Sequence, residues 1–402
     1  MTFKANQGGE ARFAAMEHTI VSSARFSPAT DPFGARSARP TACRRGRRGD
    51  TSPAATTLVF AAVTAAFGTA ASAAPSEVCT GGSSEAALAA VADRTLPIDR
   101  ERGYVVEEIA EGVHFASDGN FSMALVESAE GLVLIDAPTS MGAMIAEIAA
   151  GISERPISHV VYTHAHADHI GGAAVLDGPI EVIAGEGARH ELARVNTALR
   201  TYPFGTFVGG GGTVPSPTVI VEGSHVLRLG GRIIQFDTLE AGHSHGDMVA
   251  YLPEERVLVA VDFTWPAAAP WIRLGDAVNV PGLIAQNETL LTYEFDHLVA
   301  GHFAIVGERS DVETTIEYLN DVRDASAAAL KTVTVEQAAE RLGSYETYPL
   351  MDVYFQMVID AAAEPILAEW SDRLQGVGTW ACTHVQKMVA SLRFDEMREI
   401  RD

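Results

Sequence analysis

The sequence predicts an α/β protein of mixed strands and helices, with a helical region at its C-terminal end. Short apolar segments separated by turn residues between positions 104 and 136 indicate an antiparallel meander of strands. A second series of strands is expected over 218–261, and a helical pattern continues from Asp311 to the end of the chain. Hydrophobic residues make up 47% of the 402 residues, so the chain can bury a sizeable core and is not a disordered protein.

Helices and strands alternate between the two strand-rich stretches. Isoleucines at helical spacing predict the first helix, and a continuous apolar run predicts the buried strand that follows it. A strand-rich stretch that is followed by helices therefore occurs about twice along the chain. The expected elements are, in order, a helix over 144–152, a strand over 157–162, a helix from about Gly171, a strand over 180–184 and a helix over 188–199.

Two segments, 201–217 and 264–282, show little periodicity and are expected to be long loops. Both lie near the segments that carry the candidate metal ligands, so we expect them to shape a pocket. The aromatic residues that could form its wall are Tyr202, Phe204, Trp265 and Trp271.

Residues 1–74 have the order of a secretory signal. This segment carries nine Lys or Arg against four acidic residues, with a basic cluster at 44–48. A charge-free apolar stretch follows and ends in the small-residue run Ala71-Ser72-Ala73, which suits a signal peptidase. We predict that the segment is removed and that the protein is exported, periplasmic or secreted, with an organelle transit peptide as the alternative. No stable membrane span is expected, because Ala, Thr and Gly dominate the apolar stretch.

The chain as a whole is strongly acidic, although residues 1–74 are basic. Lys and Arg number 29 against 52 Asp and Glu, for a formal net charge of -23. Such a surface repels polyphosphates, so nucleic acid is excluded as a partner. Cys79 and Cys382 can pair in an oxidising compartment, and two free thiols are the alternative. The predicted domains are a flexible lead-in over 75–103, a main domain over 104–320 and a helical extension over 321–402 that caps the pocket or forms a homodimer face.

The strongest functional signal lies directly after the buried strand over 157–162. His164, His166, Asp168 and His169 place three imidazoles and a carboxylate within six residues, followed by two glycines. Neutral imidazole and carboxylate groups are the ligands that zinc and iron prefer. A turn that presents so many of them predicts a site for more than one metal ion.

Three further candidate ligands lie at the ends of later strands. His243 occurs in a Gly-His-Ser segment, Asp262 follows the apolar strand over 257–261, and His302 follows a glycine. Each is a weak signal alone, but together with the motif they form a set of seven ligand-capable residues near strand ends. His245, two residues from His243, is a candidate proton donor and catalytic residue.

Over about residues 104–320, these motifs resemble the metallo-β-lactamase superfamily. The resemblance implies a four-layer αβ/βα sandwich with two metal ions at one edge of the sheets, zinc ions with iron or manganese as alternatives. It implies that His164, His166 and His243 hold the first ion, that Asp168, His169 and His302 hold the second, and that Asp262 bridges both.

The implied activity is hydrolysis of a small-molecule ester, thioester, lactone or amide by a metal-bridging hydroxide. Asp168 is expected to orient that hydroxide and to take up its proton. A bridging Asp262 is typical of the glyoxalase II-like and lactonase-like branches. Three alternatives stay open: a single-iron oxidoreductase similar to persulfide dioxygenases, β-lactamase activity, and a member that binds metal without catalysis.

Overall fold

The computed structural model describes residues 78, 80–201 and 213–394. Its first sheet has seven strands in chain order, antiparallel from β1 to β4 and parallel from β4 to β7. The predicted meander is therefore confirmed. The strands are β1 Val105–Ala110, β2 Val113–Ser117, β3 Ser122–Ser128, β4 Gly131–Ile135, β5 Ile157–Tyr162, β6 Glu181–Gly185 and β7 Val219–Val221.

The second sheet has five strands in the order β12-β11-β10-β9-β8. All pairs are antiparallel except β11 with β12, which run parallel. The three-residue strand β12 was not predicted, because it is too short to show a periodic pattern. The strands are β8 Ser224–Leu229, β9 Arg232–Thr238, β10 Met248–Leu252, β11 Val257–Val259 and β12 His297–Val299.

The two sheets face each other across a shared apolar core. Fully buried side chains from both sheets, such as Phe115 and Phe236, form one cluster. A second cluster joins the first sheet to α2 (Ile145–Ile152) and α4 (Glu186–Thr201). A third joins the second sheet to α7 (Val280–Leu290) and α8 (Arg309–Thr332). The order helix, sheet, sheet, helix that these clusters give confirms the expected four-layer sandwich.

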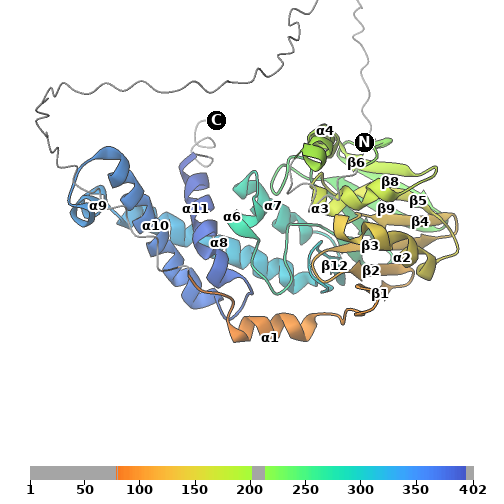
Figure 1. Ribbon diagram of the computed structural model, residues 1–402, viewed down its shortest axis with the longest axis horizontal. Coiled ribbons are helices and arrows are strands. Elements are labelled where there is room, and N and C mark those ends of the chain that lie inside the picture. Colours follow the sequence, from red (N-terminus) through yellow and green to blue (C-terminus); the bar gives the residue numbers. More distant parts are fainter. Residues whose placement is uncertain (1–77, 79, 202–212, 395–402) are drawn as a thin grey trace, which may run out of the picture. The chain divides into compact units, whose positions relative to one another are not determined.

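The C-terminal helices form a further apolar cluster of their own. Residues of α7, α8, α10 and α11 pack together there, with Tyr318 and Trp370 fully buried. These helices lie to one side of the two sheets in Figure 1. The remaining helices are α1 Glu85–Arg94, α3 Ala167–Ile170, α6 Ile272–Gly275, α9 Val335–Leu342, α10 Thr347–Trp370 and α11 Val377–Phe394, with 3-10 turns η1 Thr139–Met144 and η2 Gly171–Val175.

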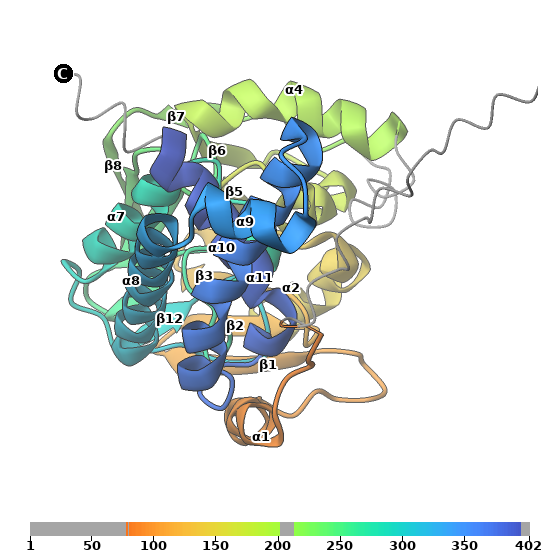
Figure 2. The same cartoon turned by 90° about the vertical axis from the view of Figure 1, so that its left-hand side faces the viewer.

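The predicted lead-in over 75–103 is not a simple flexible segment, because it contains α1. Ser84 caps this helix by accepting a hydrogen bond of 3.1 Å from the backbone of Ala87. At its other end, both guanidinium nitrogens of Arg94 donate to the Asp311 carboxylate at 2.7 and 2.8 Å. The helix therefore ties the lead-in to α8, and it lies at one end of the C-terminal helices in Figure 2.

One predicted helix boundary is wrong. The helix expected from Gly171 starts earlier, at Ala167, and tightens into η2. A β carbon at Gly172 would lie 2.4 Å from the carbonyl oxygen of Pro138, so the chain is closely packed here. Helix α8 continues across the predicted domain boundary at residue 320. The helical pattern is interrupted between α9 and α10 at residues 343–346, and Pro349 lies in the first turn of α10, where its missing N–H is not needed.

Two predictions about the chain ends fall partly outside the described residues. The leader over 1–74 and Cys79 lie outside them. Cys382 is in a disulfide, but its partner is not among the described residues, so the pairing with Cys79 stays a prediction. Among the helices that the structure describes, none is long and apolar enough to span a membrane.

Candidate metal centre

The seven predicted ligands come together at one edge of the two sheets. β5 leads directly into His164, and the short helix α3 carries Asp168 and His169. From the second sheet, Asp262 follows β11 and His302 follows β12. Their ligand atoms form two groups, and within each group all of them lie within 4.8 Å of one another.

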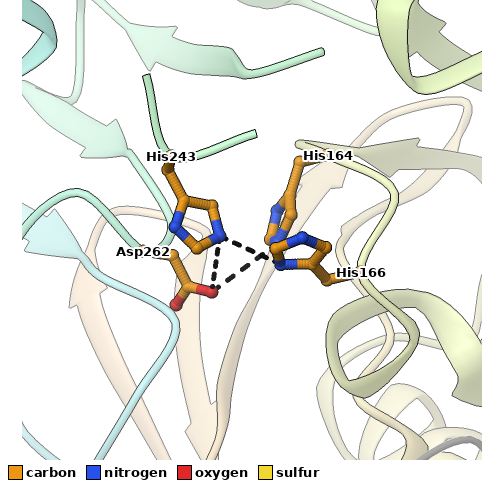
Figure 3. Close-up of side chains that lie close together, drawn as sticks. All are labelled: His164, His166, His243 and Asp262. Atoms are coloured by element: carbon orange, nitrogen blue, oxygen red, sulfur yellow. Dashed lines mark hydrogen bonds and ion pairs between the residues drawn. The ribbon is translucent and has the colours of Figure 1, made fainter. Parts of the chain in front are cut away.

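The first group consists of His164, His166, His243 and Asp262, whose side chains point toward one another in Figure 3. Nε2 of His243 lies 3.0 Å from Nδ1 of His166. Oδ2 of Asp262 lies 3.3 Å from Nε2 of His243 and 3.6 Å from Nε2 of His164. Three imidazoles and one carboxylate thus converge on one point.

The second group consists of Asp168, His169 and His302, and Asp262 adjoins it as well. Nε2 of His169 lies 3.6 Å from Oδ2 of Asp168 and 3.2 Å from Oδ2 of Asp262. Asp262 has a left-handed backbone, with φ of 68°. Of the carboxylates that the structure describes, it alone lies within 3.6 Å of imidazoles from both groups.

Buried polar atoms without hydrogen-bond partners show that the site fits a metal. Within the described part of the chain, no hydrogen bond reaches Nε2 of His164, Nε2 of His169 or Oδ1 of Asp262, although all three atoms are buried. Buried polar atoms are normally satisfied, so such a cluster needs an explanation. Imidazole nitrogens and carboxylate oxygens are suitable ligands for zinc, iron or manganese, and a cation would satisfy them all.

The pKa values of the group support the same conclusion. Burial holds the pKa of His164 well below its usual range and, with the neighbouring His243, lowers the pKa of His166 to about 4. Burial opposes protonation of His169 too, but the Asp262 and Asp168 carboxylates outweigh it and raise the pKa to about 10. A bound cation would take the place of that proton beside the carboxylates.

Neighbouring groups fix the tautomers of two of the candidate ligand histidines. The Thr163 hydroxyl donates to Oδ2 of Asp136 at 2.7 Å, so its oxygen accepts from Nδ1 of His164 at 3.1 Å. The carbonyl oxygen of Asn120 likewise accepts from Nδ1 of His302 at 3.1 Å. In both rings Nε2 is left unprotonated and available to a metal. Asp136 thus acts on the site through its hydrogen bond with Thr163.

Gln286 on α7 holds the loop that carries His243. No sequence motif predicted this role of Gln286. Its Oε1 accepts from the backbone N–H of His243 at 3.0 Å, and its Nε2 donates to Asp247 at 2.7 Å. Asp247 in turn accepts from the backbone N–H of Ser244 at 2.8 Å. No motif surrounds Gln286, so no local signal could have found it.

Other predicted site residues lie in different surroundings. The His245 side chain is exposed and belongs to neither ligand group, so its catalytic role stays a prediction. Trp265 is buried, whereas Trp271 is 59% exposed. Tyr202 and Phe204 lie outside the described residues.

The fold and the site together define an α/β sandwich with a metal-ligand cluster at one sheet edge. The family model described as "Metallo-beta-lactamase superfamily" matches residues 119–325, which is half of the chain, so the chain belongs to that superfamily. This confirms the family that the sequence motifs indicated.

The chain is also similar to two curated alkylsulfatases. It is 26% identical over 240 residues to a linear primary-alkylsulfatase of a Pseudomonas strain, covering 50% of this chain and 44% of the relative. It is 28% identical over 182 residues to an (R)-specific secondary-alkylsulfatase of Pseudomonas sp., covering 36% and 28%. The matches thus span less than half of either relative.

One solved structure supports the fold assignment. A stereoselective inverting sec-alkylsulfatase from Pseudomonas sp. superimposes with a TM-score of 0.50 at 20% identity, over 72% of this chain and 50% of that one. The sequence motifs predicted hydrolysis of an ester but did not predict a sulfate ester.

Proposed function

We propose that this protein is a dinuclear metal-dependent hydrolase that cleaves the sulfate ester of a small alkyl alcohol. The observation that supports two metal ions is the position of Asp262 beside both ligand groups, within 3.6 Å of His164, His169 and His243. The substrate class is inferred from the two alkylsulfatase relatives. A sulfate ester is a narrower substrate class than the ester, thioester, lactone or amide expected from the sequence.

Two divalent ions, when bound, would lower the pKa of coordinated water toward about 7 and polarise the ester. The residues around the site hold the ligand side chains in one protonation state and one orientation. The Thr163 hydroxyl oxygen accepts a hydrogen bond from Nδ1 of His164, and the Asn120 carbonyl oxygen accepts one from Nδ1 of His302. Nε2 of each ring is therefore left without a proton. Burial keeps water from competing for most of these nitrogens.

Asp168 is the residue best placed to move a proton. It lies in the first turn of α3, and its side chain is 28% exposed while that of Asp262 is 6% exposed. One oxygen faces His169, and the partial exposure allows exchange with solvent. Asp168 is therefore the general base in this proposal. The exposed His245 is the proton donor, and a His245→Ala variant tests that role.

The alternatives predict other metals or products. A single-iron oxidoreductase would hold one iron per chain, and a β-lactamase would open a cephalosporin ring. Nothing in the site geometry favours either over hydrolysis of an ester. Metal analysis of the purified full chain is expected to find two zinc ions, with iron or manganese as replacements.

The direct test is sulfate release from a substrate panel. The full chain, loaded with zinc, is offered primary and secondary alkyl sulfates beside an aryl ester, a lactone, a thioester and a chromogenic cephalosporin. The alkyl sulfates should be turned over with release of inorganic sulfate, the other four substrates should not be hydrolysed at a comparable rate, and a chelator should stop the reaction. Turnover of another substrate class without sulfate release would overturn the proposed substrate.

Export remains a proposal that rests on residues 1–74 and their signal-like order. Mature protein from the native source is expected to begin near Ala74 or Pro75. Detection of Met1 in the mature protein would exclude removal of the leader.

A homodimer through the C-terminal helices is likewise a proposal. Measurement of the molecular size in solution tests it.

A further inference from the structure

The segment between β11 and α7 contains an uncommon backbone turn. Four successive residues, Arg273 to Asp276, have left-handed φ values of 52°, 59°, 67° and 54°. Only one of them, Gly275, is a glycine. Left-handed helical turns of ordinary residues are disfavoured, because the β carbon crowds the next carbonyl oxygen. Such a turn persists only where its surroundings hold it, and it commonly marks a functional site.

The C-terminal helices hold this turn in place. The Thr383 hydroxyl on α11 accepts from the backbone N–H of Arg273 at 3.0 Å. One residue further along α11, Nε2 of His384 lies 3.0 Å from the carbonyl oxygen of Trp271. Leu274 is fully buried in the cluster that α8, α10 and α11 share. The turn is thus fastened to α11 by two hydrogen bonds and one buried side chain.

The protonation state of His384 is set by its two partners. A carbonyl oxygen only accepts, so Nε2 carries the proton and donates it to Trp271. Nδ1 must then accept, and the Tyr318 hydroxyl donates to it at 2.6 Å. Burial lowers the pKa of His384 to about 4, so the ring is neutral at pH 7. Tyr318 on α8 therefore orients His384, and His384 orients the turn.

The other side of the turn packs against a predicted metal ligand. A β carbon added at Gly275 would lie 2.8 Å from the Trp265 ring and 3.6 Å from Nδ1 of His243. The backbone just after the turn is bonded to the same loop, because Val278 N–H donates to the carbonyl oxygen of His243 at 3.1 Å. Nε2 of His243 lies 3.0 Å from Nδ1 of His166, whereas Nδ1 of His243 has no hydrogen-bond partner among the described residues, so on its Nδ1 side the ring is held by the neighbouring turn and not by a hydrogen bond.

We propose that Tyr318 and His384 are positioning residues for the metal centre, holding the left-handed turn Arg273–Asp276 against the imidazole of His243. The C-terminal helices then complete the metal centre although none of their residues is a ligand. This inference rests on the metal site of the proposed function but not on the sulfate ester.

The test measures metal binding and not only turnover. Zinc affinity is measured by competition with a chromogenic chelator, and the cobalt-substituted protein is compared by its visible absorption spectrum. The variants are Tyr318→Phe, His384→Leu and His384→Gln, all in the full chain. His384→Gln keeps a side-chain N–H that can donate to Trp271, whereas His384→Leu does not. Tyr293→Phe is the matched control, since its hydroxyl donates to Asp237 at 2.8 Å in another part of the fold.

Tyr318→Phe and His384→Leu are expected to weaken zinc binding about tenfold or more and to shift the cobalt spectrum. His384→Gln should recover most of the affinity, and Tyr293→Phe should stay within about twofold of wild type. If His384→Leu fails to fold, the conservative Tyr318→Phe still carries the test.

Zinc affinity within about twofold of wild type in Tyr318→Phe would overturn the inference, as would an equal loss in Tyr293→Phe. A wild-type protein that binds no zinc would overturn both proposals. Two bound zinc ions without sulfate release would remove only the proposed substrate, and the comparison of zinc affinities would still decide the positioning role.

Discussion

Nε2 of His302 lies 3.0 Å from Oδ1 of Asp262, while the other three nearby imidazoles approach Oδ2 of the same carboxylate. The two oxygens of one side chain therefore have different neighbours. Burial alone would raise the pKa of Asp262, but His169 and His302 hold it well below its usual range. Asp262 is thus an ionised carboxylate placed between two groups of nitrogen ligands.

Asp262→Asn should reduce metal content. Asn keeps the volume and tolerates the left-handed backbone at φ of 68°, so the fold should persist. The lost charge removes the group shared by both sites, and turnover at saturating zinc should fall by about tenfold or more. Metal content and initial rates measure the effect.

Asp168→Asn should lower turnover even when zinc is saturating, since it removes the proposed proton acceptor. The comparison with Asp262→Asn separates proton handling from metal retention. Rates within about threefold of wild type for both variants, with two metals bound, would contradict the proposed mechanism, because threefold is less than 1.36 kcal/mol of barrier.

His166→Ala should lose metal, because it removes one of three nitrogens from the first group. His225→Ala is the control: His225 stacks on Phe236 at 6.3 Å between ring centroids and belongs to neither ligand group. Its metal content should match wild type. Equal metal loss in both variants would mean that damage to folding, and not ligand removal, caused the effect.

Gln286→Ala should destabilise the protein and loosen the His243 loop. The change leaves the buried backbone N–H of His243 and a carboxylate oxygen of Asp247 with one partner fewer, at a cost of about 1–3 kcal/mol. Zinc affinity should fall with it. Gln235→Ala is the control, because Gln235 donates to Asp237 on β9, away from the ligands. Urea unfolding and zinc competition test both, and a normal zinc affinity in Gln286→Ala would contradict its role.

His384 should make the metal-free protein less stable as the pH falls. Burial lowers its pKa from 6.5 to about 4, so between these values the unfolded chain binds a proton that the folded chain does not. Stability is full above pH 6.5 and decreases toward pH 4, by about 2 kcal/mol at pH 5. His384→Gln should lack this component. Urea unfolding at pH 8 and pH 5 measures it, and parallel losses in both proteins would show that His384 does not cause the effect.

Local sequence patterns were sufficient to predict much of the fold. Apolar runs and turn residues predicted the strands of the meander and β5, because a buried strand needs a particular sequence wherever it lies. The same patterns missed α1 and the short β12, whose stability depends on contacts such as Arg94 with Asp311. Boundaries near Gly171 also shifted, since close packing at Gly172 decides where that helix tightens.

The candidate ligands could be found in the sequence because metal chemistry restricts residue type, and the motif at 164–169 places four of the seven together. The residues that hold these ligands in place could not be found in the sequence. Gln286 lies 43 positions from His243, and His384 lies 113 positions from Trp271. A glutamine or a histidine in an ordinary helix carries no sign of its distant partner. Only the packing of α7 and α11 against the site loops brings these donors and acceptors within hydrogen-bond distance, and so decides how the ligands are held.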